Sequence, residues 1–127
     1  MQPTLLVFLG AGIGGALRHG VNQACARLCG VAFPWGTLTV NVVGSLAMGL
    51  VIGWLAARAD ADWSQPLRLF LTTGILGGST TFSAFSLDSI LLWQRGEWLA
   101  ALAYVGASVV ASIAALALGL SLMRVLT

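Results

Sequence analysis

The chain has 127 residues, of which 58% are hydrophobic and only 8% are charged, and its net charge is +2. A soluble domain carries about a quarter charged residues, so this composition predicts an all-α membrane protein. A membrane-spanning helix needs roughly 20 apolar residues, and little chain remains outside such stretches. The composition therefore excludes a separate soluble catalytic domain.

We expect one transmembrane domain covering residues 1–127, with four helices at about 4–22, 35–57, 67–93 and 98–122. A proline stands just ahead of each of the first three, where its missing N–H costs little. All five tryptophans fall near predicted helix ends, as in the aromatic belt of a membrane–water interface. These residues are Trp35, Trp54, Trp63, Trp93 and Trp98.

The first predicted helix carries Gly10 and Gly14, whose spacing favours close helix contact within one subunit or between subunits. Arg18 lies toward its far end, where a guanidinium can attract anions into a vestibule. In the second helix, Asn41 lies about one turn inside the membrane. A buried amide is costly unless it is paired, so Asn41 either bonds a neighbouring helix or donates to an anion.

The third predicted helix contains the stretch "GGSTTFSAFS", which is poor helix material inside an apolar span. Gly77 and Gly78 can break the helix, and Ser79 or Thr80 can cap the half that restarts. We therefore expect a break near residues 77–80. Such a break exposes carbonyl groups that suit a cation and N–H groups that suit an anion.

Phe82 and Phe85 share one face of the restarted helix. Such a pair usually packs in a core, but ring edges carry the positive part of the aromatic quadrupole and can face an anion. Asp88 is the only acid clearly within a span. It could carry a proton, pair with an arginine or lie near the interface.

In the fourth helix, Tyr104, Ser108 and Ser112 are spaced four apart and project from one face. A single serine often bonds a carbonyl of its own helix. Three aligned hydroxyls favour a polar track through the membrane.

The arginines do not favour either orientation of the four helices. Arg58, Arg68 and Arg124 fall on the side of the termini, and the other three fall on the opposite side: Arg18, Arg27 and Arg95. Orientation is normally set by an excess of Lys and Arg in the cytoplasmic loops, and here the excess is zero. The tie is either chance or a sign of dual topology, with copies inserted both ways up.

Nothing in the sequence marks an enzyme. The stretch 77–81 lacks the lysine of a phosphate-binding loop, and no nucleophile–base pair is present. Cys25, Cys29 and His19 match no strong metal motif. No nucleic-acid partner is expected.

Four motifs in order resemble the Fluc/CrcB family of small fluoride channels: "GGALRH" (14–19), "PWGTLTVNVVGS" (34–45), "GILGGSTTFSAFS" (74–86) and "YVGASVVAS" (104–112). The resemblance implies an antiparallel dual-topology homodimer in the cell inner membrane with two fluoride pores. It assigns Phe82, Phe85, Asn41, Tyr104, Ser108 and Ser112 to the pores and Arg18 to a vestibule. It assigns the carbonyls of Gly77 and Thr80 to a structural sodium ion. The chain departs from many relatives at Ala84, where they have threonine.

The function implied is passive, fluoride-selective export. The alternative is a proton-coupled exporter of the small-multidrug-resistance type, which is also built from four helices. That class needs a membrane-embedded carboxylate, usually in the first helix, and the first helix here has none.

Overall fold

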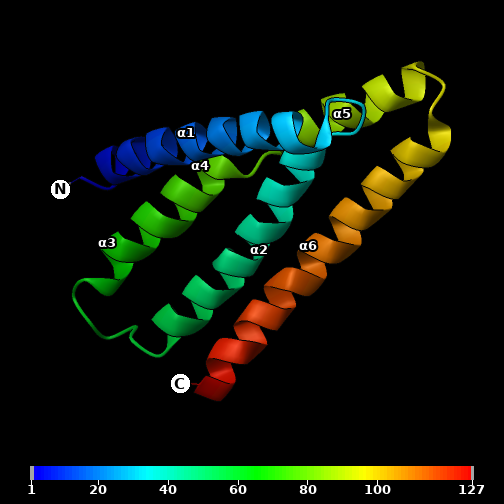
Figure 1. The fold of residues 1–127 in the computed structure, drawn as a ribbon. Coiled ribbons are helices and arrows are strands. Elements are labelled where there is room, and N and C mark those ends of the chain that lie inside the picture. Colours follow the sequence, from blue (N-terminus) through cyan, green and yellow to red (C-terminus); the bar gives the residue numbers. More distant parts are fainter. Residues whose placement is uncertain (1, 127) are drawn as a thin grey trace.

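The computed structural model describes residues 2–126, whose regular elements are all helical (Figure 1). They are α1 (Pro3–Cys29), α2 (Trp35–Ala56), α3 (Ser64–Arg68), the π-helical segment η1 (Leu69–Leu76), α4 (Gly77–Ser79), α5 (Phe82–Gln94) and α6 (Trp98–Leu126). Four helical stretches are long and apolar enough to cross a membrane: α1, α2, the run from Ser64 to Gln94, and α6. The prediction of an all-α fold with four potential spans is confirmed.

Two of the spans continue several residues past their predicted C-terminal ends. Helix α1 continues past Asn22 to Cys29, and α6 continues past Leu122 to Leu126. Hydropathy marks only the apolar part of a helix, whereas Ala26 and Leu28 still favour helix beyond it. Helix α1 ends at Gly30, whose φ of 83° lies in a region that glycine tolerates best.

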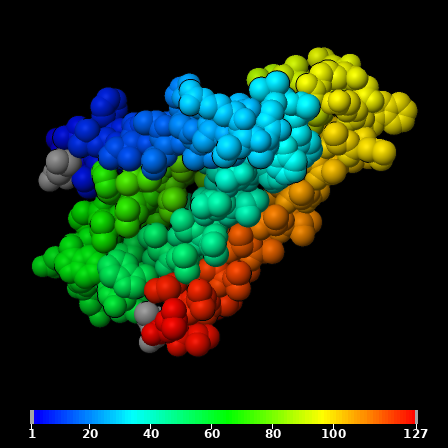
Figure 2. Space-filling view, viewed as in Figure 1, coloured from blue at the N-terminus to red at the C-terminus, as the bar shows by residue number. Residues whose placement is uncertain are grey.

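The spans form two close pairs. Helix α1 lies against η1 and α4, and α2 packs most extensively on α6 (Figure 1). Contacts between α1 and α2 join the two pairs. Helix α5 diverges from this body, and the turn that joins it to α6 projects from the rest of the surface (Figure 2). The non-helical segment between α1 and α2 lies toward the same end as that turn.

Glycines allow the helix axes of each pair to approach closely. A Cβ atom on Gly14 would lie 2.1 Å from the carbonyl oxygen of Ile75, and one on Gly49 would lie 2.2 Å from that of Leu116. Both distances are impossible for a real side chain, so these positions require glycine. Within this chain, the small residues of the first two spans therefore serve contacts inside one subunit.

The third span leaves the helical conformation at Thr80 and Thr81, after the two glycines and not at them. Gly77 and Gly78 are helical, and Thr80 and Thr81 are the extended residues between α4 and α5. Gly78 lies against α1, where an added Cβ would be 2.7 Å from the carbonyl oxygen of Ala11. Packing against α1 thus explains Gly78 without any break at that residue.

Hydroxyl groups satisfy the backbone on both sides of the extended residues. The Ser79 and Thr80 hydroxyls both donate to the carbonyl oxygen of Leu76, at 3.1 and 2.9 Å, at the end of α4. The Thr81 hydroxyl accepts from the N–H of Ala84 at 3.2 Å and caps α5. The prediction that Ser79 or Thr80 caps the restarted helix is therefore wrong, because the helix restarts at Phe82.

Candidate functional site

Asn41 of α2 is joined to Thr81 by two hydrogen bonds. Its Nδ2 donates to the carbonyl oxygen of Thr81 at 3.1 Å, and its Oδ1 accepts from the Thr81 N–H at 2.9 Å. An extended backbone inside an apolar span leaves both groups without helical partners, and one amide side chain satisfies both. Of the two roles expected for Asn41, pairing within the protein therefore uses the amide oxygen and one of the two N–H protons. The second N–H proton has no part in this pair.

A cavity of about 400 Å³ adjoins this pair. It is bounded by α2, the extended residues, α5 and α6, and every side chain that lines it is uncharged. The cavity brings together most of the residues predicted for an anion site. Its lining residues are Asn41, Gly44, Ser45, Met48, Thr80, Thr81, Phe82, Phe85, Ser108, Val109, Ser112, Ile113 and Leu116.

The hydroxyl groups of Ser108 and Ser112 are buried in the wall of this cavity. Within residues 2–126, neither Oγ atom has a hydrogen-bond partner. Most buried hydroxyls bond a carbonyl of their own helix, as Ser89 does with Phe85 at 2.8 Å. Leaving a buried hydroxyl unpaired costs about 1–3 kcal/mol. The two serines therefore offer free hydrogen-bonding capacity to whatever occupies the cavity.

Aromatic rings form one end of the cavity. The ring centroids of Phe82 and Phe85 lie 5.4 Å apart, and those of Phe85 and Tyr104 lie 5.3 Å apart. Phe85 is 9% exposed and Phe82 is 77% exposed. The pair therefore does not share a common buried core within one chain. Phe85 belongs to the core, whereas Phe82 presents its ring to the surroundings.

Tyr104 lies beyond Phe85 and is completely buried. Its hydroxyl donates to Oδ2 of Asp88 at 3.2 Å, and its ring meets Phe33 in an edge-to-face contact at 5.5 Å. Tyr104 is not among the lining residues of the cavity. Its polar group thus faces away from the two serines with which the sequence aligns it.

A second cavity of about 280 Å³ is lined in part by Phe33 and Asp88, the two residues that contact Tyr104 from this side. It is more polar than the first, with Asn22, Thr37, Asp88 and Arg95 among its lining residues, and Phe33 also lines it. This cavity lies under the segment between α1 and α2. Tyr104 therefore connects the wall of this polar cavity with Phe85 in the wall of the serine-lined cavity.

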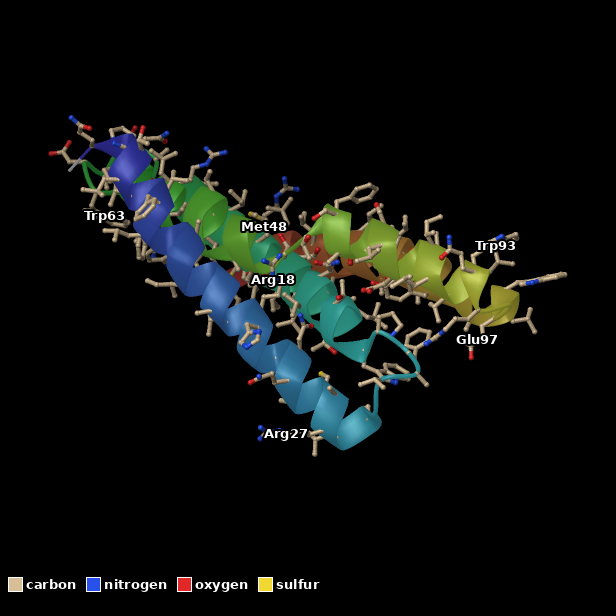
Figure 3. The ribbon with its side chains drawn as sticks, turned by 90° about the horizontal axis from the view of Figure 1, so that it is seen from above. Arg18, Arg27, Met48, Trp63, Trp93 and Glu97 are labelled. Atoms are coloured by element: carbon tan, nitrogen blue, oxygen red, sulfur yellow. The ribbon has the colours of Figure 1, made fainter. Side chains whose placement is uncertain are left out.

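Of the remaining predicted residues, Arg18 and Gly77 lie outside both cavities and Thr80 lines the first. Arg18 is half-buried and projects from α1 on the side of the neighbouring helices, whereas Arg27 points away from them (Figure 3). Gly77 is exposed on the surface of the chain, and Thr80 is half-buried in the wall of the first cavity. The structure therefore does not bring Arg18 or Gly77 to the serine-lined cavity.

Sequence reasoning missed Thr81 and Phe33. Thr81 directly precedes the apolar run 82–93, and a threonine before such a run is an N-cap signal. Phe33 stands in a segment that hydropathy leaves as a connection, and no local pattern indicates its contact with Tyr104. Thr81 was therefore accessible to sequence reasoning, and Phe33 was not.

Comparison with known proteins gives consistent results. The family described as CrcB-like protein, Camphor Resistance (CrcB), matches residues 5–120. A protein of Methylobacterium nodulans named Fluoride-specific ion channel FluC is 58% identical over 124 residues, which are 98% of each chain. A protein of the same name from Beijerinckia indica is 53% identical over 127 residues, the full length of both chains. Fluoride-specific ion channel FluC 2 of Nitrobacter hamburgensis is 54% identical over 123 residues, covering 97% of this chain and 98% of its own. All three are named as ion channels and not as enzymes.

Proposed function

Because the chain belongs to the CrcB family, we propose that this multi-pass membrane protein is a fluoride-selective channel that exports fluoride passively. The observation that carries the proposal is the pair of buried, unpartnered serine hydroxyls in an uncharged cavity. Fluoride is a small anion that holds its water tightly. A selective pore must therefore replace that water with hydrogen-bond donors.

The serine-lined cavity has donors of two strengths. The hydroxyls of Ser108 and Ser112 and the second Nδ2 proton of Asn41 are conventional donors. The edges of Phe82 and Phe85 carry a weaker positive charge. Because no cationic side chain lines the cavity, an anion would be held without a deep electrostatic well and could leave quickly.

We assign the structural sodium ion to the carbonyl oxygens of Gly77 and Thr80, and the hydrogen bonds at the extended residues support this. In a continuous helix, the Thr81 N–H would bond Gly77, but it donates to Asn41. Likewise, the Ala84 N–H would bond Thr80, but it donates to the Thr81 hydroxyl. Both carbonyl oxygens are thereby released from helical pairing, and neutral oxygen donors at the end of a helix suit a cation.

The functional unit that we propose is an antiparallel homodimer with dual topology. Gly77 and Phe82 are exposed in a single chain, and a second copy would cover both. Two copies related by a twofold axis would bring four released carbonyl oxygens to one point. The equal division of the six arginines supports insertion in both orientations.

Passive export suits the acid–base chemistry of fluoride. Hydrogen fluoride crosses bilayers as a neutral weak acid and dissociates in a less acidic cytoplasm, where the anion is trapped. In the inner membrane, a negative interior potential favours outward movement of the anion by about 2.3 kcal/mol per 100 mV. The channel then needs neither a nucleotide nor a coupled ion.

The deciding experiment is ion efflux from liposomes that contain the purified protein. Liposomes loaded with fluoride should lose it rapidly when a potassium ionophore balances the charge, and liposomes loaded with chloride should retain it. Equal loss of both anions, or loss of neither, would reject a fluoride-selective channel.

The sodium ion can be tested separately from conduction. Purifying the protein with sodium replaced by a large organic cation should lower the temperature at which the dimer dissociates, and restoring sodium should reverse the change. If dimer stability does not depend on sodium while fluoride efflux is normal, the sodium site is wrong and the channel is not.

A further inference from the structure

Tyr104 lies between lining residues of the two cavities, and we refer to its side chain as the partition. On one side its ring contacts Phe85, which lines the serine-lined cavity. On the other side it contacts Phe33 and Asp88, which line the second cavity. Tyr104 itself is fully buried. Tyr104 therefore contacts lining residues of both cavities.

One of the contacts that hold Tyr104 comes from outside the helices. Phe85 and Asp88 are on α5, but Phe33 belongs to the non-helical segment between α1 and α2. A segment of this kind lacks the helical hydrogen bonds that would fix its position. The Phe33 ring is nevertheless held between Trp35, with centroids 4.6 Å apart, and Tyr104 at 5.5 Å.

Arg95 ties this segment to the α5–α6 turn. Its Nη2 atom donates to the carbonyl oxygen of Ala32 at 2.5 Å and to Oε2 of Glu97 at 2.7 Å. Glu97 lies at the end of the molecule where the α1–α2 segment turns (Figure 3). Ala32 directly precedes Phe33, so the guanidinium group holds the backbone beside the ring that meets Tyr104.

We propose that Arg95 is a positioning residue for the fluoride path. By holding the Ala32 carbonyl, it keeps Phe33 against Tyr104 and so fixes the partition between the two cavities. Its effect on flux rests on the proposed function. Its effect on Tyr104 does not, because that effect is a property of the resting structure.

The exposure of the Arg95–Glu97 ion pair indicates that Arg95 positions the α1–α2 segment and contributes little to the stability of the whole fold. The side chains of Arg95 and Glu97 are 49% and 47% exposed, and ion pairs with that much solvent contribute little to folding. Loss of Arg95 should therefore leave the four-helix body intact. The bond to Ala32 joins segments 63 residues apart in the sequence, so its loss releases the α1–α2 segment locally.

Tyr104 supplies a specific readout because it is the only tyrosine in the chain. Protein labelled with ¹³C in the tyrosine ring gives signals from one residue, and their chemical shifts depend on the neighbouring Phe33 ring. Arg95→Gln should move these signals in the same direction as Phe33→Leu. Arg95→Lys keeps the charge and a donor, and should stay near the wild-type position.

Fluoride efflux should follow the same pattern. We expect Arg95→Gln and Phe33→Leu each to reduce efflux about three- to tenfold at unchanged dimer yield. The double variant should be no slower than the slower single variant, because residues acting through one contact are not additive. Arg58→Gln is the matched control, since Arg58 donates to the Trp54 carbonyl at 3.1 Å in a different part of the chain.

The proposal is overturned if Arg95→Gln leaves the Tyr104 signals where they are. It is also overturned if the double variant loses flux by the product of the two single-variant factors. A shift of the Tyr104 signals by Arg58→Gln as large as that by Arg95→Gln would also overturn it. If the wild-type protein carries no fluoride, the proposed function fails, and the Tyr104 signals still decide whether Arg95 holds the partition.

Discussion

At the level of single residues, substitution of Ser108 or Ser112 should affect folding stability and fluoride efflux in different ways. An unpaired buried hydroxyl weakens the folded state, so removing it should relieve a cost. We expect Ser108→Ala to leave the free energy of unfolding unchanged or to raise it by up to about 1 kcal/mol. The unfolding temperature should then stay the same or rise slightly. Fluoride efflux should nevertheless fall several-fold, because the cavity loses a donor.

Ser89→Ala is the matched control for that experiment. The Ser89 hydroxyl already donates to the Phe85 carbonyl, so its removal should leave efflux unchanged. Thermal unfolding and liposome efflux are measured on the same preparations. If Ser108→Ala destabilises the protein and conducts normally, its hydroxyl is a structural group.

Phe82 and Phe85 should respond differently to the same substitution by isoleucine, which keeps apolar bulk and removes the ring quadrupole. Phe85→Ile should cost about 1 kcal/mol of packing, because Phe85 lies in the core against Tyr104. Phe82→Ile should cost a single chain much less, since Phe82 is 77% exposed. Fluoride efflux should fall sharply in both. Near-normal efflux in both would remove these rings from the pore.

For single residues, the sequence indicated which side chains are polar groups inside the membrane, but not which groups they bond. The sequence marks Asn41 as a buried amide that needs pairing, but not that Thr81 provides it, since the register between the second and third spans is not encoded locally. The same limit applies to Tyr104, which shares a helical face with Ser108 and Ser112. Its hydroxyl instead bonds Asp88, because side-chain direction depends on the neighbouring helix.

At the level of elements, the third span shows tertiary packing overriding local propensity. Gly77 and Gly78 are two adjacent residues of low helix propensity, yet both are helical, and Gly78 permits the approach of α1. The π-helical geometry of η1 has no local sequence signal. The four spans themselves were predictable because length and hydropathy define them.

The cap on α5 gives an element-level prediction. Thr81→Val removes the oxygen that accepts from the Ala84 N–H, and should destabilise the protein by about 0.5–2 kcal/mol. Thr81→Ser keeps that oxygen and should restore most of the stability. Thermal unfolding in detergent measures the difference. Thr73→Val, at an exposed position on η1, is the control. Equal effects of valine and serine at position 81 would show that the hydroxyl does not cap α5.

For the whole molecule, the balance of three arginines against three predicts insertion in both orientations. Adding two or three lysines to one terminus should bias insertion and reduce fluoride export. Coexpressing a variant with the opposite bias should restore export, because the proposed antiparallel dimer would need one copy of each orientation. Export is measured as growth in fluoride medium and as fluoride retained by cells.

Labelling of a single added cysteine near a terminus tests the orientation directly. The cysteine should replace an exposed residue in a background without the two native thiols, Cys25 and Cys29. A reagent that cannot cross the membrane should then label about half of the copies in intact cells. Labelling of all copies or of none would reject dual topology.

Asp88 decides between a passive pore and a proton-coupled exporter, because an exporter needs a carboxylate that changes protonation in every cycle. Asp88 lines the second cavity and accepts a hydrogen bond from Tyr104, and no other acid is among the lining residues of the two cavities described above. We expect Asp88→Asn to keep fluoride flux electrogenic, with a reversal potential set by the fluoride gradient alone. Tyr104→Phe removes the same hydrogen bond and keeps the carboxylate, so it separates loss of the bond from loss of the acid. Flux through the wild type is measured in liposomes with the membrane potential clamped and the pH gradient present or absent. A passive pore gives the same flux in both conditions. A proton-coupled exporter would instead require the proton gradient, and its flux would disappear in Asp88→Asn but not in Tyr104→Phe.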